Sequence, residues 1–228
     1  DEHRQGTEDV EGDMGSLQGK TLGISGNGNA IDGNNHSGVT ISNGQTLGVD
    51  NVSSFGNLDT AITNNGGTLN ISDTTFENNS VKDVENNGQM NLSKSNSFEK
   101  QVTGTGDIKV TDGTSTFNNG LNQNSIEISS GATLTTHNTA TVNGGKNDGL
   151  INGSGSLINS GEFDNNNNIN VDVTNNGEMT SKAEHFNKTI TNNDTLNLSG
   201  TLSKTVYGNN GTTYVDKDLA INESGNID

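Results

Sequence analysis

The sequence contains no cysteine, no proline and no tryptophan, and each absence narrows what the chain can be. Without cysteine, the chain has neither disulfide bonds nor thiolate metal ligands. Without proline, every strand residue keeps its backbone N–H, which favours strands that are paired on both sides. Lack of cysteine is common in exported bacterial proteins, but it does not by itself assign a compartment.

Basic residues and long apolar segments are also scarce. Arg4 is the only arginine, the lysines are scattered, and the formal net charge is -17. Such an acidic chain with no basic face opposes contact with phosphates, so we expect no nucleic-acid partner and no anionic membrane surface. No segment approaches the ~20 apolar residues that a membrane-spanning helix needs. We therefore expect no direct membrane insertion of this segment.

Apolar residues are few but regularly spaced. Leu, Ile, Val and Phe together number 47 of 228 residues, close to the level below which disorder is expected. A narrow core one turn wide, however, needs only a few apolar residues per turn. The abundant residues are Asn (40) and Gly (31), which reach positive φ at least cost and are typical of a fold with many tight turns.

One turn recurs with the same flanking residues: an aliphatic residue, Thr or Glu, Asn-Asn, Gly, any residue, then Leu or Met. Clear or variant copies lie at 84–90, 102–108, 173–179 and 190–196. Units of this size cannot bury their own apolar side chains, so the repeat predicts a solenoid of stacked turns. The turn landmarks are Gly44, Gly66, Gly88, Gly106, Gly131, Gly161, Gly177, Asp194 and Gly211. The interval 131–161 leaves two alternatives, one turn with a long loop or two turns.

Apolar and polar residues alternate after each turn, as at 69–72, 90–93, 108–111 and 196–199. Alternation of this kind is typical of strands with one buried face, here including Ile71 and Leu92. No helical period is present in residues 20–228. We therefore predict an all-β fold, a right-handed parallel β-helix of about nine to ten turns over 20–228. Residues 1–19, which hold six acids, are predicted to be an acidic tail or linker, with a helical cap or processing segment as the alternative.

Aromatic and amide residues are expected to stack from turn to turn. Phe76, Phe98 and Phe117 occupy one repeat position and are predicted to stack in the core, with Phe186 and Tyr207 in comparable places. Phe163 instead falls in the position of Met179. At the turns, Asn is predicted to stack on Asn, because amide ladders satisfy one another in stacked strands.

Evidence for catalysis is sparse. Polysaccharide-degrading β-helix enzymes need clustered acids or a metal. The four His lie in unrelated repeat positions, and no Ser-His-Asp or His-x-x-x-His spacing occurs. One candidate column of acids pairs Asp107 with Glu85. We predict no catalytic, cofactor-binding or metal-binding residues and do not expect an enzyme.

The sequence offers residues for two other binding chemistries. Asp32 with Asn34 and Asn35, and Asp112 with Gly113, offer oxygen ligands for calcium, but the same residues are typical of turns, which is the interpretation we favour. Weak calcium binding stays an open alternative. Thr-rich stretches at 133–136 and 139–141 suggest ice binding, which needs a threonine array in register on every turn. The repeat does not supply one.

The repeat strings resemble the passenger domains of bacterial autotransporters and related two-partner-secreted adhesins, which belong to type V secretion. The likeness lies in the Asn-Asn-Gly-x-Leu-Asn-Ile/Leu-Ser strings near 64–72, 86–93 and 192–199, and in 150–161. It covers about 20–228. Phe-x-x-Asn strings at 76–79 and 163–166 are similar to chlamydial polymorphic membrane proteins, but the companion Gly-Gly-Ala-aliphatic motif is missing.

This resemblance implies export to the bacterial surface and, most often, adhesion or self-association. The chain opens at Asp1 without an initiator Met, so we expect a mature or excised segment of a longer protein. The predicted function is that of a secreted or surface-displayed adhesin segment whose Asn/Thr/Ser-rich face binds a host or surface receptor or identical chains. The alternatives are a structural spacer or stalk of a larger surface protein and, less favoured, a polysaccharide-degrading enzyme.

Overall fold

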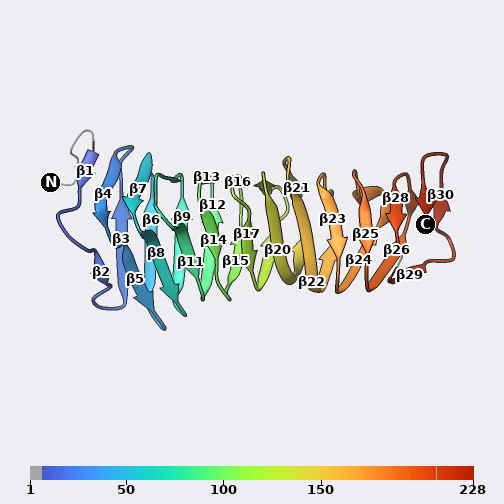
Figure 1. Ribbon diagram of the computed structural model, residues 1–228, viewed down its shortest axis with the longest axis horizontal. Coiled ribbons are helices and arrows are strands. Elements are labelled where there is room, and N and C mark those ends of the chain that lie inside the picture. The colour runs from blue at the N-terminus through green and yellow to red at the C-terminus, as the bar shows by residue number, and fades with distance from the viewer. Residues whose placement is uncertain (1–6, 209) are drawn as a thin grey trace.

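The computed structural model describes residues 7–208 and 210–228, which form a parallel β-solenoid of about ten turns. Figure 1 shows the turns following one another along the long axis in chain order, from the N-terminal end to the C-terminal end. The predicted all-β class and parallel β-helix are confirmed. Within the described ranges, the single helical element is the 3-10 helix η1 (Ala183–His185).

The strands fall into three stacks, which we call columns 1, 2 and 3 in the order that the chain visits them within a turn. Strands of successive turns pair in parallel, and in column 3 the ladder is reduced to isolated bridges at Ile169 and Phe186. Column 1 consists of β2 (Gly15–Ser16), β5 (Val39–Ser42), β8 (Thr60–Asn65), β11 (Lys82–Asn86), β14 (Gln101–Thr103), β17 (Leu121–Gln123), the first parts of β20 (Thr139–Asn147) and β22 (Ser156–Asn165), β23 (Asp172–Asn175), β25 (Ile190–Asn192), β28 (Thr205–Tyr207) and β31 (Asn226–Ile227).

Columns 2 and 3 complete each turn. Column 2 consists of β3 (Thr21–Ser25), β6 (Thr46–Asp50), β9 (Thr68–Ser72), β12 (Gln89–Ser93), β15 (Asp107–Val110), β18 (Ser125–Ile128), the second parts of β20 and β22, β24 (Glu178–Lys182), β26 (Thr195–Ser199) and β29 (Thr212–Val215). Column 3 consists of β1 (Thr7–Asp9), β4 (Ala30–His36), β7 (Ser54–Leu58), β10 (Thr75–Glu77), β13 (Ser95–Phe98), β16 (Thr114–Phe117), β19 (Thr133–Thr136), β21 (Leu150–Asn152), β27 (Thr201–Leu202) and β30 (Ala220–Ile221).

The core is a thin apolar channel along the rod axis, filled by alternate residues of each strand. In β12, Met90 and Leu92 are completely buried, whereas the residues between and beside them are partly exposed. Leu92 lies opposite Ile71 of the preceding turn and Val110 of the next. The prediction that Ile71 and Leu92 are interior is confirmed, since both are at most 1% exposed.

Column 3 contains a continuous stack of phenylalanine rings. Phe55, Phe76, Phe98 and Phe117 are fully buried, and consecutive rings lie 5.4, 5.0 and 4.9 Å apart between centroids. The predicted core stacking of Phe76, Phe98 and Phe117 is therefore confirmed. Stacked rings at this spacing add attraction beyond the area that they bury.

The later aromatic residues follow the prediction with one exception. Phe186 continues column 3 through a bridge to Ile169, and Phe163 pairs with Met179, as expected. The prediction for Tyr207 was wrong. Tyr207 lies in column 1 opposite Thr191 and is 42% exposed. In that turn the core residue of column 3 is the buried Leu202. The spacing in the sequence predicted Tyr207 to lie in column 3, but the chain has already reached column 1 of the next turn at this residue.

The corner between columns 1 and 2 is held by buried amides, as predicted. Asn159 donates from Nδ2 to Asn175 Oδ1 over 3.0 Å, and Asn175 donates likewise to Asn192 over 2.9 Å. A second run joins Asn64 to Asn86 over 2.9 Å. All of these side chains are 0% exposed. The ladder satisfies amide groups and corner backbone atoms that would otherwise be buried without partners.

The interval 131–161 holds an additional turn rather than a long loop. β20 runs through both column 1 and column 2 and pairs with β17 and β18 on one side and with β22 on the other. The landmark Gly131 lies at a different corner, between columns 2 and 3, because Thr133 pairs with Thr114. The turns at 42–45 and 129–132 are locally alike, with Gly44 and Gly131 at φ 81° and 84°, but they occupy different corners.

The rod begins within the segment that the sequence assigned to a tail or linker. β1 pairs with β4 and β2 with β5, and Leu17 is only 7% exposed. The few apolar side chains in this acidic stretch supply the inward residues: Leu17 joins the core and Met14 packs against it. Residues 1–6 of the predicted tail lie outside the described residues.

Candidate binding surface

Column 2 presents a broad polar surface to solvent, which we call the polar face. In β12 the outward residues are Gln89, Asn91 and Ser93, and the register repeats this arrangement from turn to turn. We define the polar face by the outward residues of column 2: Thr21, Gly23, Ser25, Thr46, Gly48, Asp50, Thr68, Asn70, Ser72, Gln89, Asn91, Ser93, Asp107, Lys109, Ser125, Glu127, Lys146, Glu162, Asp164, Glu178, Thr180, Lys182, Thr195, Asn197, Ser199, Thr212 and Tyr214. Strand spacing sets equivalent side chains about 4.8 Å apart.

Many side chains of the polar face bind one another across turns. Asn91 Nδ2 donates to Asn70 Oδ1 over 2.9 Å, and Asn197 Nδ2 donates to Thr180 Oγ1 over 3.1 Å. Lys109 Nζ and Glu127 Oε2 lie 3.5 Å apart. These contacts hold the side chains in fixed orientations. A ligand that approaches this face therefore orders fewer side chains on binding, which lowers the entropic cost of association.

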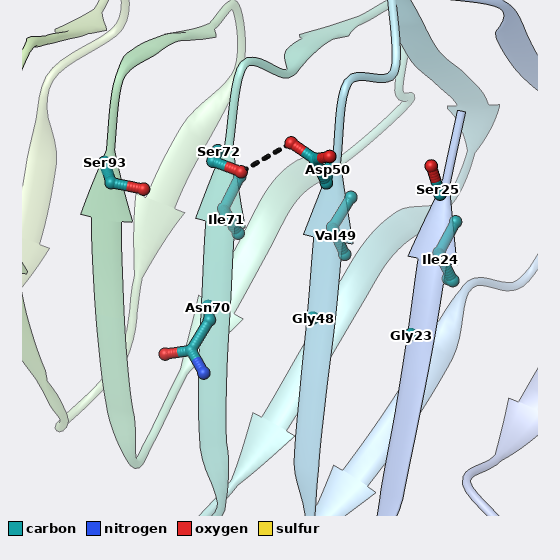
Figure 2. Close-up of a pocket in the computed structure, with 10 residues that line it drawn as sticks. All are labelled: Gly23, Ile24, Ser25, Gly48, Val49, Asp50, Asn70, Ile71, Ser72 and Ser93. Atoms are coloured by element: carbon teal, nitrogen blue, oxygen red, sulfur yellow. Dashed lines mark hydrogen bonds between the residues drawn. The ribbon is translucent and has the colours of Figure 1, made fainter. Parts of the chain in front are cut away.

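The polar face has a hollow near its N-terminal end, of about 390 Å³ (Figure 2). Gly23 and Gly48 lie opposite each other in its floor. Neither has positive φ, and a Cβ at either position meets no atom within 4 Å, so neither the backbone nor crowding demands glycine there. Along one side, Ser72 Oγ donates to Asp50 Oδ1 over 2.7 Å.

The predicted column of acids does not form. Glu85 lies in column 1 opposite Thr103, whereas Asp107 lies in column 2 opposite Gln89. Glu85 is 2.7 Å from Lys82 Nζ, and hydrogen bonds from Lys82 and Asn87 lower the pKa of its carboxyl. The two acids are on opposite sides of the corner, so the spacing in the sequence did not bring them onto one face.

The residues considered for calcium serve as turn and corner residues. Asp32 Oδ1 accepts hydrogen bonds from the backbone N–H of Asn34 over 2.9 Å and from Asn57 Nδ2 over 3.1 Å. Asp112 Oδ1 accepts one from the backbone N–H of Lys94 over 2.7 Å. In the described part of the chain, no group of three or more His, Asp or Glu residues is placed to hold a metal ion. Across the same part, no helix has the length and apolar character needed to cross a membrane.

One buried carboxylate was missed by the sequence reasoning. Asp83 is 0% exposed and accepts hydrogen bonds from Asn79 Nδ2 over 2.8 Å and from the backbone N–H of Lys100 over 2.9 Å. Burial raises its pKa from 3.8 to about 6, although these hydrogen bonds oppose the shift. The register of β11 shifts between Lys82 and Val84, so Asp83 and Val84 are both buried. The alternation of strand residues could not reveal this.

We expect the stability of the rod to decrease as pH rises from about 4 to about 6 because of Asp83. Its pKa is higher in the folded than in the unfolded chain, so the folded chain binds more protons in this range. The loss is up to about 3 kcal/mol in the free energy of unfolding. The measurement is the difference in unfolding free energy between the wild type and Asp83→Asn across this range. The other acidic residues are common to both proteins, so their contribution to the pH dependence cancels in this difference. A difference that does not change with pH contradicts the prediction.

The architecture and the polar face therefore come from the repeat itself. Comparison of the chain with protein-family models, curated proteins and solved structures found no match to any of them. The likeness to passenger domains of secreted adhesins rests on the repeat strings, and the structure supports the β-solenoid that this likeness implies.

Proposed function

We propose that this chain is a segment of a secreted or surface-displayed bacterial β-helix adhesin that binds through its polar face. The observation that carries the proposal is the repetition of outward amide and hydroxyl groups, already joined as in Asn70–Asn91 and Thr180–Asn197, at the spacing of the turns. Each group contributes one weak hydrogen bond. A partner that meets several turns at once gains affinity by avidity rather than from a single strong site.

The partner is either a receptor on a host or other surface or an identical chain. The polar face carries both hydrogen-bond donors and hydrogen-bond acceptors, so the polar faces of two identical chains can form hydrogen bonds with each other. The net charge of -17 makes identical chains repel at low ionic strength. Self-association through this face is therefore expected to strengthen as salt screens the repulsion, whereas attachment to a cationic receptor weakens.

The test uses beads coated with the chain and follows both their clumping and their attachment to host cells. Asn91→Arg places a bulky cation on the polar face, and Thr116→Arg places the same change on the outward side of column 3. We expect Asn91→Arg to reduce clumping or attachment at least severalfold and Thr116→Arg to leave them unchanged. If the two variants change clumping and attachment equally, the polar face is not the binding surface. Beads that neither clump nor attach favour the spacer alternative.

A further inference from the structure

A second hollow lies outside the polar face, at the corner where column 3 leads into β25 and β28 of column 1 (Figure 1). Its volume is about 420 Å³. Ile190 lies opposite Val206, so Lys188 and Lys204, each two residues earlier, occupy the same position in successive turns. The side chains that line the hollow belong to Asp172, Asn187, Lys188, Thr189, Ser203, Lys204, Thr205, Tyr207 and Ser224.

The two lysines of this hollow are neighbours without an acidic partner. Strand spacing brings equivalent positions to about 4.8 Å, and like charges at such positions destabilise a sheet. In column 2, by contrast, Glu127 lies between Lys109 and Lys146 in the register. Among the described residues, neither Lys188 nor Lys204 has a carboxylate oxygen within 4.0 Å of its Nζ, whereas Lys109 and Lys146 each have one. A pair of unpartnered cations in a chain of net charge -17 indicates a place for an anion from outside the chain.

One acid also lines the hollow, and it is engaged with the backbone. Asp172 Oδ1 accepts a hydrogen bond from the backbone N–H of Thr189 over 3.2 Å. Two lysines against one aspartate leave the hollow with an excess of one positive charge. Charges farther away than about 8 Å are largely screened at physiological salt, so the acids of the rest of the chain act weakly here. The nearest charges therefore favour an anionic ligand.

Tyr207 offers a second kind of contact. In β28, Thr205 and Tyr207 lie on either side of the buried Val206 and point outward, and Tyr207 is 42% exposed. The tyrosine ring has an apolar body, against which the C–H face of a sugar ring can pack. The hydroxyls of Thr189 and Thr205 can donate and accept hydrogen bonds. A small inorganic anion uses only the lysines, whereas the volume of the hollow is that of sites for small organic molecules, which begin at about 300 Å³.

We propose that this corner hollow binds an acidic sugar residue, such as a uronic acid, through its carboxylate. The ammonium groups of Lys188 and Lys204 donate charge-assisted hydrogen bonds to the carboxylate, which removes the repulsion between them. The sugar ring packs against Tyr207, and its hydroxyls pair with the threonines and serines of the hollow. The site lies on a different surface from the polar face and does not depend on the adhesion proposed for that face.

The test titrates the whole chain with glucuronic acid and follows binding by NMR, with glucose and sulfate as comparators. We expect glucose to bind about tenfold more weakly than glucuronic acid or not at all, and added salt to weaken binding of the acid. Lys204→Gln is expected to weaken it about tenfold, which corresponds to the loss of one charge-assisted hydrogen bond. The matched control is Lys217→Gln, which removes the same charge from an exposed residue at the corner between columns 2 and 3, and it is expected to change nothing.

Two further variants test the acid and the ring. Asp172→Asn removes a negative charge from the hollow and keeps the oxygen that accepts from Thr189, so we expect it to tighten binding of glucuronic acid severalfold. Tyr207→Thr replaces the ring with the residue that the preceding turn has at this position, Thr191, so the strand is expected to tolerate it. We expect this variant to weaken binding of glucuronic acid severalfold and to leave binding of sulfate unchanged.

Four outcomes overturn the proposal. In the first, glucuronic acid does not bind the wild type. In the second, glucose binds as tightly as glucuronic acid, so the lysines are not used. In the third, Lys204→Gln and Lys217→Gln bind the acid equally well. In the fourth, sulfate binds as tightly as glucuronic acid and Tyr207→Thr affects neither, which means that the hollow holds a small inorganic anion only. Asn91→Arg alters only the polar face, so failure of adhesion through that face leaves this test unaffected.

Discussion

Replacing Leu92 with Asp is expected to lower the free energy of unfolding by about 5 kcal/mol, because the change removes a buried apolar side chain and leaves an unpaired charge in the core. Leu92 is 0% exposed and lies between Ile71 and Val110, so no water or cation is available to the carboxylate. The variant therefore has to protonate its new side chain or open the rod. Thermal unfolding followed by circular dichroism measures the loss.

The matched control is Asn91→Asp, which introduces the same charge at the neighbouring residue. Asn91 points outward and is partly exposed, so its carboxylate stays hydrated, and we expect a change below about 1 kcal/mol. If Leu92→Asp unfolds at the wild-type temperature, Leu92 is not interior and the assignment of inward residues in column 2 is wrong. The control separates this result from a general effect of added negative charge.

Shortening Phe98 to Ala is expected to cost about 4 kcal/mol, in the range measured for buried aromatic truncations. The ring lies between Phe76 and Phe117, with interplanar angles of 8° and 6°, so its removal leaves a gap between two rings that the backbone of the neighbouring turns holds apart. Hydrogen exchange is the most direct measurement. We expect faster exchange in β10, β13 and β16 and little change at the ends of the rod, because each turn contacts only its neighbours.

Phe98→Leu is the conservative comparison for this position. Leucine keeps an apolar side chain in the stack and is expected to recover much of the loss, because less empty space remains between the rings. Ser97→Ala, on the outward side of the same strand, is expected to change stability by less than about 1 kcal/mol. If Phe98→Leu is as destabilising as Phe98→Ala, filling the space does not explain the effect and ring stacking itself contributes most of the energy.

The sequence was most informative where structure depends on nearby residues. The turn at 173–179 and the alternation at 90–93 each involve a few consecutive residues, and both appear as expected in the structure. The buried Asn ladder was also predictable, because a repeated turn places Asn at the same corner each time. Stacking then follows, since a unit of this size can bury its apolar residues only against its neighbours.

The register between turns was harder to predict because it depends on the length of every intervening corner. The turns at 42–45 and 129–132 look alike in sequence, yet they lie at different corners. This ambiguity hid the additional turn formed by β20. Glu85 and Asp107 fail to pair for another reason, because they lie on opposite sides of a corner, in columns 1 and 2. No local pattern measures the accumulated length of several turns, so such pairings emerge only from the folded chain.

The amino-acid sequence by itself therefore determined that the chain winds into stacked parallel strands, and which residues of most strands face the core, because turn chemistry and alternation act over a few residues. Only the tertiary structure decided which side chains from different turns meet. The burial of Asp83 and the pairing of Gly23 with Gly48 in the polar face both result from such meetings. Partners one turn apart are separated by many residues of chain, and their contact is set by packing of the whole rod.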